Sequence, residues 1–231
     1  MDRNNERLSD LISPIVSDRG LSLRTASFGR PKEFQATWKR SGNVVEIMIS
    51  DYLADAPDDV ITDFFGGVAD TIIGKRPRYG IAFLNWVRSD EFISGKRKIY
   101  LRRSRNLRGT PQGNERDLIA SLDRLLDSGH LSGENIDNSF FSWTKNPNVR
   151  KVGYCSPMMR VVGVSSVLDD ASVPEFVLDY VVYHESLHLA RGYRPGERAH
   201  DRSFRTDEKR YEGHEEAERF LKDLGARKKV K

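Results

Sequence analysis

The segment 183–204, YHESLHLARGYRPGERAHDRSF, constrains the fold of this chain more than any other stretch. It carries two histidines, His184 and His188, four positions apart. In an α-helix, residues i and i+4 lie on the same face, about 6 Å apart along the axis. Two imidazoles in that arrangement can bind one metal ion. The segment therefore predicts either a metal site or a helix whose histidines form hydrogen bonds in a protein core.

The residues before this motif predict that its histidines lie on a buried helix face. Residues 172–175, SVPE, fit a capping box with proline near the first turn, and Gly192 can end the helix after about Ala190. One stripe at spacings i, i+4, i+7 and i+11 contains Val177, Val181, His184 and His188, whereas Asp179 lies on the opposite side and is expected to be solvated. Histidines on a buried face need a partner, and a metal ion would supply one.

Glu185 directly follows the first histidine and lies about a quarter turn away from it on the helix. From there its carboxylate cannot easily join the same ligand set, but it can reach a water molecule at the metal. This is the position of the general base in zinc peptidases that carry the HExxH motif. The motif thus predicts zinc bound by His184 and His188, with Glu185 as the catalytic residue.

A catalytic zinc site needs a third protein ligand. The candidates downstream are Glu197, His200, Asp201, Glu208 and His214. The segment RGYRPGERA holds two glycines and a proline, so the chain is expected to leave the helix and turn. A new helix capped by Asp201 would place His200 immediately before its N-terminus, able to face back to the metal. We therefore predict His200 as the third ligand. His214 lies in the charged stretch EGHEEAER and is expected to face solvent.

Composition places the chain among globular proteins. Of its 231 residues, 38% are hydrophobic and 10% aromatic, enough to build a core. No apolar run approaches the roughly 20 residues that span a bilayer, and the N-terminal MDRNNERLSD lacks the apolar stretch of a signal peptide. The single cysteine, Cys155, excludes an internal disulfide. These features predict a cytoplasmic protein.

Hydrophobic patterning predicts an α+β fold in two parts. Helical stripes are expected at residues 8–16, 55–74 and 115–128, with Asp55 and Asn114 as caps of the second and third helices. Strands are expected at 21–28, 33–40 and 43–50, with Ser41-Gly42 as a tight turn, and KIYL at 98–101 reads as a short strand. The stretch 128–148 is rich in Gly, Ser and Asn, so we place the boundary there, between an N-terminal region 1–137 and a domain 138–231.

A run of basic residues suggests a second kind of partner. Between residues 96 and 108, KRKIYLRRSRNLR holds no acid and these seven cations: Lys96, Arg97, Lys98, Arg102, Arg103, Arg105 and Arg108. Such a cluster can contact the phosphates of DNA or RNA. A solvated surface without a partner is an equally good interpretation, because charge runs are weak signals.

The second half of the chain resembles the SprT-like zinc metallopeptidases and their YgjP-like relatives. The resemblance covers residues 150–221 and is carried by VRKVGYCSP, RVVGVSSVLDDASVPEFVLDYVVYHESLHL, HDRSF and YEGHEEAERFL. It implies a small zincin fold, in which a short sheet packs on the active-site helix and the strand 160–166 borders the cleft. It also implies that His184, His188 and His200 bind zinc while Glu185 activates water for peptide hydrolysis.

The chain departs from this family in the loop before the third ligand. Eleven residues separate His188 from His200, more than in the shortest members, and Asp201 stands where a small residue is common. Glu197 and Asp201 therefore stay open as rivals of His200. Some relatives cut proteins crosslinked to DNA, and in such a protein the basic run would contact the DNA. The alternative function is nucleic-acid binding, with the zincin-like domain as a scaffold of little or no activity.

Overall fold

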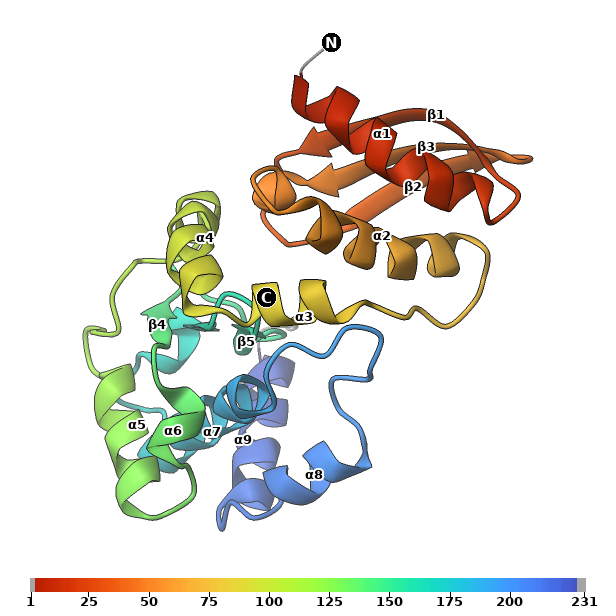
Figure 1. The fold of residues 1–231 in the computed structure, drawn as a ribbon. Helices are drawn as coiled ribbons and strands as arrows, with labels where there is room; N and C mark the ends of the chain where they lie inside the picture. Colours follow the sequence, from red (N-terminus) through yellow and green to blue (C-terminus); the bar gives the residue numbers. More distant parts are fainter. Residues whose placement is uncertain (1–2, 228–231) are drawn as a thin grey trace. The chain divides into compact units, whose positions relative to one another are not determined.

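The computed structural model describes residues 3–227 and has an α+β architecture, as predicted (Figure 1). The chain forms two compact units that divide between Arg103 and Ser104, earlier than the boundary at 137/138 expected from composition. The physical reason is that the helix near residue 120 packs against the histidine-bearing helix and shares its core. Each unit is described separately below. In the described part of the chain, no helix combines the length and the apolar character needed to cross a membrane.

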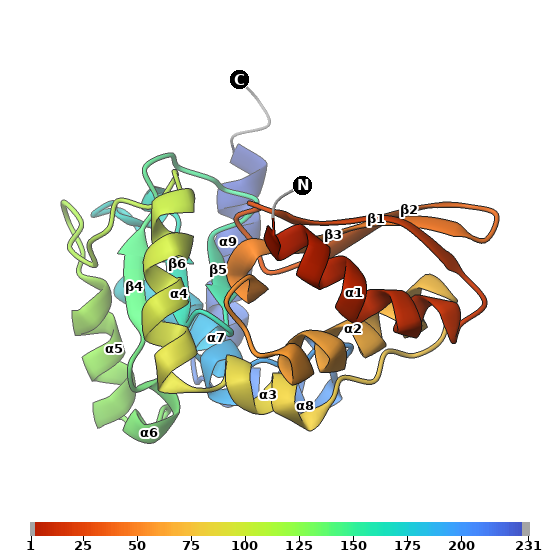
Figure 2. The same cartoon turned by 45° about the horizontal axis from the view of Figure 1, so that its top comes forward.

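The first unit is a three-stranded sheet with helices on one face (Figure 2). Its central strand β3 pairs in parallel with β1 and antiparallel with β2. The predicted turn joins β2 to β3, where Gly42 has a φ of +61°. The strands and helices of this unit are α1 (Arg3–Ser17), β1 (Ser22–Gly29), β2 (Ala36–Ser41), β3 (Val44–Ser50), η1 (Asp51–Leu53), α2 (Asp58–Ile72), α3 (Ile81–Val87) and α4 (Asp90–Arg103).

The basic run was expected to contain a strand at 98–101, but those residues belong to the helix α4. Phe92, Lys96 and Tyr100 are buried at a spacing of four, which is helical. The Lys96 ammonium group bonds both oxygens of Asp55, at 2.5 and 2.6 Å. Asp55 is therefore an ion-pair partner and not the cap of α2, where Pro57 takes the N-cap position without a side-chain hydrogen bond.

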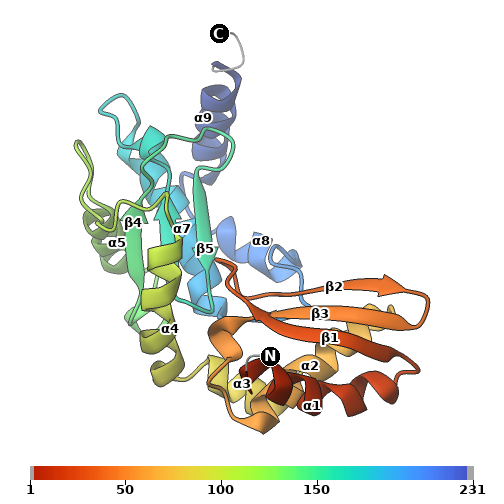
Figure 3. The ribbon, with the colours of Figure 1, turned by 90° about the horizontal axis from the view of Figure 1, so that it is seen from above.

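The second unit packs its helices around a small sheet of order β4-β6-β5. In Figure 3, α7 is seen behind the strands of this sheet. The central strand β6 is buried along its whole length, pairs in parallel with β4 and pairs antiparallel with β5. The elements are α5 (Leu118–Asp127), α6 (Gly133–Ile136), β4 (Phe140–Trp143), β5 (Gly153–Ser156), β6 (Val161–Val164), η2 (Ser166–Leu168), α7 (Glu175–Arg191), α8 (Arg202–Glu208) and α9 (His214–Arg227).

The helix α7 is the centre of this unit and is buried almost all round, not only on the predicted stripe. Buried apolar residues such as Val177, Leu178 and Val182 contribute to one core together with residues of α5, β4 and β6. Even Asp179 is only 8% exposed. Its carboxylate accepts hydrogen bonds from the Ser121 hydroxyl and, at 2.6 and 2.8 Å, from the Arg124 guanidinium of α5. A buried carboxylate is tolerated because it is paired in this way.

Candidate metal centre

Two candidate ligands lie on the last turns of α7. His184 and His188 are half-buried, whereas the residues between them, from Glu185 to Leu187, are buried. The helix ends as predicted at Gly192, whose φ of +66° lies in the region that favours glycine. Its amide N–H bonds the carbonyl of His188 at 3.2 Å, so the second histidine is held in a closed final turn.

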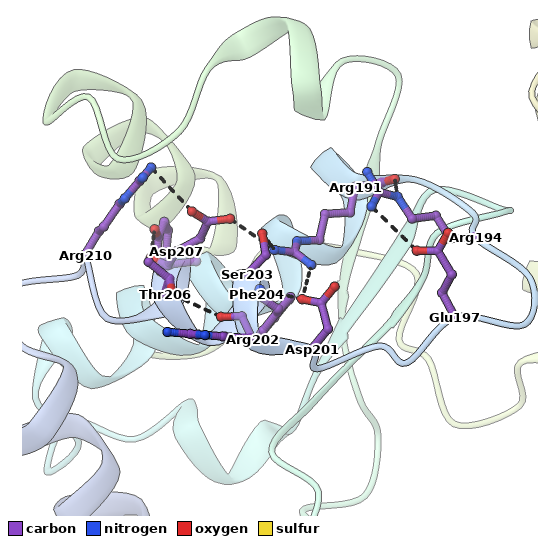
Figure 4. A network of polar contacts seen from close by, with 11 residues as sticks. Arg191, Arg194, Glu197, Asp201, Arg202, Ser203, Phe204, Thr206, Asp207 and Arg210 are labelled. Atoms are coloured by element: carbon purple, nitrogen blue, oxygen red, sulfur yellow. Dashed lines mark hydrogen bonds and ion pairs between the residues drawn. The ribbon is translucent and has the colours of Figure 1, made fainter.

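The third candidate, His200, is delivered by the loop that joins α7 to α8. Asp201 is the N-cap of α8, as predicted, and its carboxylate accepts a hydrogen bond of 2.7 Å from the backbone N–H of Phe204. The same carboxylate also accepts a bond of 2.9 Å from Arg191 at the end of α7 (Figure 4). The first bond caps α8, and the second ties the start of α8 to the end of α7. His200, the residue before the cap, therefore lies beside the two histidines of the helix.

The three imidazoles converge through the same ring atom. Nε2 of His200 lies 3.0 Å from Nε2 of His188 and 3.2 Å from Nε2 of His184. Nitrogens bound at about 2.1 Å to a tetrahedral zinc ion lie about 3.4 Å apart, close to these separations. The ligand atoms of all three residues lie within 4.8 Å of one another, close enough to hold one metal ion. The predicted set of three histidines is thus brought together.

Phe204 is the packing residue that holds the three rings in this arrangement. It is fully buried, and its ring centroid lies 5.1, 4.4 and 4.8 Å from those of His184, His188 and His200. The ring of His188 is stacked on it. An apolar wall of this kind excludes water from one side of the cluster and limits the rotation of the imidazoles.

The electrostatic surroundings of the two helix histidines, His184 and His188, keep them in the form that binds metals. Burial lowers the pKa of His188 to about 4, and the neighbouring rings of His184 and His200 lower it further. Burial also lowers the pKa of His184, although a hydrogen bond to Glu208 opposes that effect. Neutral imidazoles with a free lone pair are the ligand form, so the site is prepared for a cation at neutral pH.

Glu208 acts on His184 from the side opposite the cluster. Its Oε1 lies 2.5 Å from Nδ1 of His184 and accepts a second bond of 3.0 Å from the hydroxyl of Tyr180. A carboxylate on Nδ1 places the ring proton there, which leaves the lone pair of Nε2 directed at the cluster. Glu208 was one of the open candidates for the third ligand, but in the structure it orients a ligand instead.

Glu185, between the two histidines on α7, is buried against Gly153, the first residue of the edge strand β5. It is 6% exposed, and burial raises the pKa of its carboxyl group to about 8, while Lys151 opposes the shift. A β-carbon at position 153 would lie 2.5 Å from Oε1 of Glu185, so Gly153 leaves the space that the carboxylate needs. A pKa near neutrality suits a group that takes and returns a proton, and a cation bound nearby would lower that pKa.

The strand that borders this site differs from the expected one. Residues 160–166 were expected at the edge of the cleft, but β6 lies in the middle of the sheet with partners on both sides. The edge strand next to α7 is β5, and residues 150–153 line a cavity of about 260 Å³ together with His184 and Glu185. Val161, Val162 and Val164 are buried in the core instead, because β6 is the central strand of the sheet.

Two other expectations for polar residues near the site were wrong. His214, expected to face solvent, begins α9 and is half-buried, with its ring centroid 5.4 Å from that of Tyr180. Asp179, expected on the solvated side of α7, is paired with α5. Glu197 is not part of the histidine cluster either, and its carboxylate lies 3.7 Å from the Arg194 guanidinium.

Not all cations of the basic run are available to a partner. They are divided between the two units, and three of them are in ion pairs: Lys96 with Asp55, Arg103 with Asp51, and Arg108 with Asp169. Lys98, Arg102 and Arg105 are exposed. The paired cations serve the stability of their own unit, and only the exposed ones are available to a partner.

Comparison of the chain with protein-family models, with curated proteins and with solved structures finds no match in any of the three. The resemblance to SprT-like peptidases therefore stays a prediction, and function has to be argued from the geometry of the site.

Proposed function

We propose that this chain is a zinc-dependent peptidase of the HExxH type. One observation carries the proposal: Nε2 of His200 lies 3.0 and 3.2 Å from Nε2 of the two helix histidines, and the buried Glu185 lies between those two histidines on α7. A structural zinc site is normally closed by four protein ligands, often cysteines. Among the described residues, three histidines can act as protein ligands. A fourth coordination position is therefore left for water or a substrate.

Zinc is the metal that this donor set favours. Three imidazole ligands match the His₃ class of catalytic zinc sites, and a carboxylate such as that of Glu208 on His184 is a common outer partner of such a ligand. When bound, zinc would polarise the scissile carbonyl and lower the pKa of water. His184, His188 and His200 would hold it.

Glu185 is the general base and acid of this proposal. Its carboxylate takes a proton from the attacking water and passes that proton to the nitrogen of the leaving amine. Burial keeps bulk water from competing for the carboxylate, and Gly153 keeps the space around Oε1 open. Because β5 is an outer strand of its sheet, an extended substrate can bind along it through main-chain hydrogen bonds.

The test compares wild type with Glu185→Gln and Glu216→Gln, a matched change of an exposed glutamate on α9. Each protein is loaded with zinc, analysed for bound metal, and incubated with casein, a histone and a DNA-crosslinked protein. We expect about one zinc per chain in all three proteins, and cleavage reduced by about 10²–10⁴-fold only in Glu185→Gln. Absence of bound zinc in wild type, or equal cleavage by wild type and Glu185→Gln, would refute the proposal.

Nucleic-acid binding is the second candidate, and one observation favours it. Lys98 and Arg102 are exposed and lie four residues apart on one face of α4. Changing both to glutamine should weaken DNA or RNA binding and reduce its salt dependence. Binding that is absent, or that does not change with salt, contradicts this candidate.

A further inference from the structure

A strongly basic hollow lies next to the candidate metal centre. It has a volume of about 490 Å³, and His200, one of the three converging histidines, is part of its wall. Four cationic side chains line it: Arg198 from the loop before α8, and Arg202, Arg205 and Lys209 from α8 and its C-terminal end. We call this feature the α8 hollow.

The cations of the α8 hollow are not neutralised by the protein. All four are exposed, and none forms an ion pair with a carboxylate among residues 3–227. The one acid in the wall, Asp201, is already bonded to Arg191 and to the amide of Phe204. In Figure 4 the guanidinium group of Arg202 takes part in no marked contact.

The neighbouring acid of α8 is also engaged away from the hollow. Asp207 accepts a bond of 3.1 Å from Arg191 and lies 3.4 Å from the guanidinium of Arg210 (Figure 4). Arg191 thus binds both carboxylates, Asp201 and Asp207, at the end of α7. The result is a separation of charge, with paired groups on one side of α8 and unpaired cations on the other.

Helical geometry aligns these cations into a row. Arg202, Arg205 and Lys209 follow the spacing i, i+3, i+7 and so share one face, while Phe204 points into the core. Seven residues of helix span about 10 Å, which equals about three residues of an extended peptide. The row starts next to His200, so a chain bound along it passes the metal centre within a few residues.

We propose that the α8 hollow binds acidic side chains of the polypeptide substrate, so that the enzyme prefers peptide bonds flanked on one side by a cluster of Asp or Glu. This proposal rests on the proposed peptidase function. Carboxylates suit the hollow because Arg side chains form paired hydrogen bonds with them. Single-stranded nucleic acid fits less well, since the wall contains no Phe, Tyr or Trp on which bases could stack.

Binding is tested first, separately from catalysis. A fluorescent peptide with three consecutive glutamates and its analogue with three glutamines are titrated against the zinc-loaded full chain carrying Glu185→Gln. The hollow variant carries, in addition, Arg202→Gln/Arg205→Gln/Lys209→Gln. The control variant, Lys145→Gln/Arg219→Gln/Lys222→Gln, removes three exposed cations that lie outside the hollow. Thermal midpoints confirm that both triple variants are folded.

We expect the glutamate peptide to bind about tenfold more weakly to the hollow variant than to the control, and the difference to shrink at high salt. The glutamine peptide should not distinguish the two. Equal binding of the glutamate peptide to both variants overturns the proposal. It is also overturned if a single-stranded oligonucleotide, but not the glutamate peptide, loses affinity in the hollow variant.

Cleavage then separates the failure of this inference from failure of the proposed function. Wild type and Arg202→Gln/Arg205→Gln/Lys209→Gln, both with Glu185 intact, are compared on two peptides. One peptide has the three glutamates before a fixed central sequence, and the other has them after it. The proposal is supported if wild type prefers one of the two peptides and the hollow variant loses that preference. The loss should appear as a raised KM with little change in kcat. If wild type cleaves all peptides equally, the substrate preference is wrong but the peptidase stands. If nothing is cleaved, while acidic-peptide binding still depends on the hollow, the peptidase function is refuted and the binding site stands without its role in cleavage.

Discussion

Oε1 of Glu208 lies 2.5 Å from Nδ1 of His184, on the side of the ring that faces away from the histidine cluster. The contact joins α8 to α7 and fixes which nitrogen of His184 is free. The hydroxyl of Tyr180 bonds the same carboxylate oxygen at 3.0 Å, which holds the glutamate in place. Glu208 is therefore a positioning residue that acts through His184.

The first prediction concerns Glu208→Gln, which keeps the shape of the side chain and removes its charge. A neutral amide polarises the imidazole less, so zinc affinity should fall by about 10–100-fold. Competition with a chromophoric chelator measures this affinity. The matched control is Glu216→Gln, an exposed glutamate of α9. Equal zinc affinity in the two variants would mean that Glu208 does not support the ligand.

The second prediction concerns the space around Glu185. In Gly153→Ala the new methyl group would lie 2.5 Å from Oε1 of Glu185, so the carboxylate has to move. Because the three histidines are not touched, zinc stoichiometry should stay the same while kcat falls by about tenfold or more. The control is Gly66→Ala, where an added β-carbon meets nothing within 4 Å. A Gly153→Ala protein with unchanged kcat would show that the position of Glu185 is not limiting.

The sequence predicts the parts of the site that depend on local spacing. His184 and His188 share a face because four residues make about one helical turn. Asp201 is recognisable as a cap, and its bond to the amide of Phe204 sets the start of α8 and with it the position of His200. These features need information from only a few neighbouring residues, so the candidate ligand set can be predicted.

The features that sequence analysis missed depend on contacts between distant residues. The role of Glu208 is decided by its approach to His184, and that of Gly153 by its approach to Glu185. Asp179 looks solvated in the sequence, yet Arg124 from α5 allows its burial. No local pattern marks such pairs. A glycine within a strand is the one local signal of a close approach at residue 153.

The helix α4 was missed for a related reason. Its many charges hide the buried apolar positions Phe92, Ile93 and Tyr100, and its fourth buried residue is Lys96. A lysine is counted as solvated in any pattern of hydrophobicity. Its burial follows from the ion pair with Asp55, which lies 41 residues earlier in the chain.

The third prediction concerns the acid stability of the second unit. The buried carboxylate of Asp169 accepts bonds of 2.8, 2.9 and 3.2 Å from the backbone N–H groups of Asn114, Glu115 and Arg116. Burial alone would raise its pKa, but these donors and the Arg108 guanidinium outweigh burial, so the pKa is lowered. A carboxylate with a lowered pKa in the folded state contributes stability above its unfolded pKa of about 3.9, and this is lost as pH falls through the folded value.

Asp169→Asn should therefore reduce the free energy of unfolding by about 1–3 kcal/mol at pH 7, and the difference from wild type should close at acidic pH, below about 4. Urea unfolding is followed by the fluorescence of the buried Trp143, in a background where Trp38 and Trp86 are phenylalanine. Asp123→Asn, an exposed aspartate of α5, serves as the control. A difference that is the same at pH 3 and pH 7 would contradict this account.

The last prediction separates two adjacent arginines of the basic run. Arg103 donates two bonds of 2.7 Å to the two carboxylate oxygens of Asp51 and one of 3.0 Å to the carbonyl of Pro31. Its guanidinium also lies 5.0 Å from the centre of the Tyr52 ring. Arg102, in contrast, is exposed. The two residues share a charge and a helix, but only Arg103 links α4 to the segment after β3.

Arg103→Gln should therefore destabilise the first unit by about 1–3 kcal/mol, because it breaks a charge-assisted pair and leaves Asp51 without its partner. Arg102→Gln should change stability by less than about 0.5 kcal/mol, as is usual for an exposed side chain. Hydrogen exchange of the β3 amides reports on this unit alone and should accelerate by about 5–100-fold only in Arg103→Gln. Equal exchange in the two variants would show that the Arg103–Asp51 pair adds no stability to this unit.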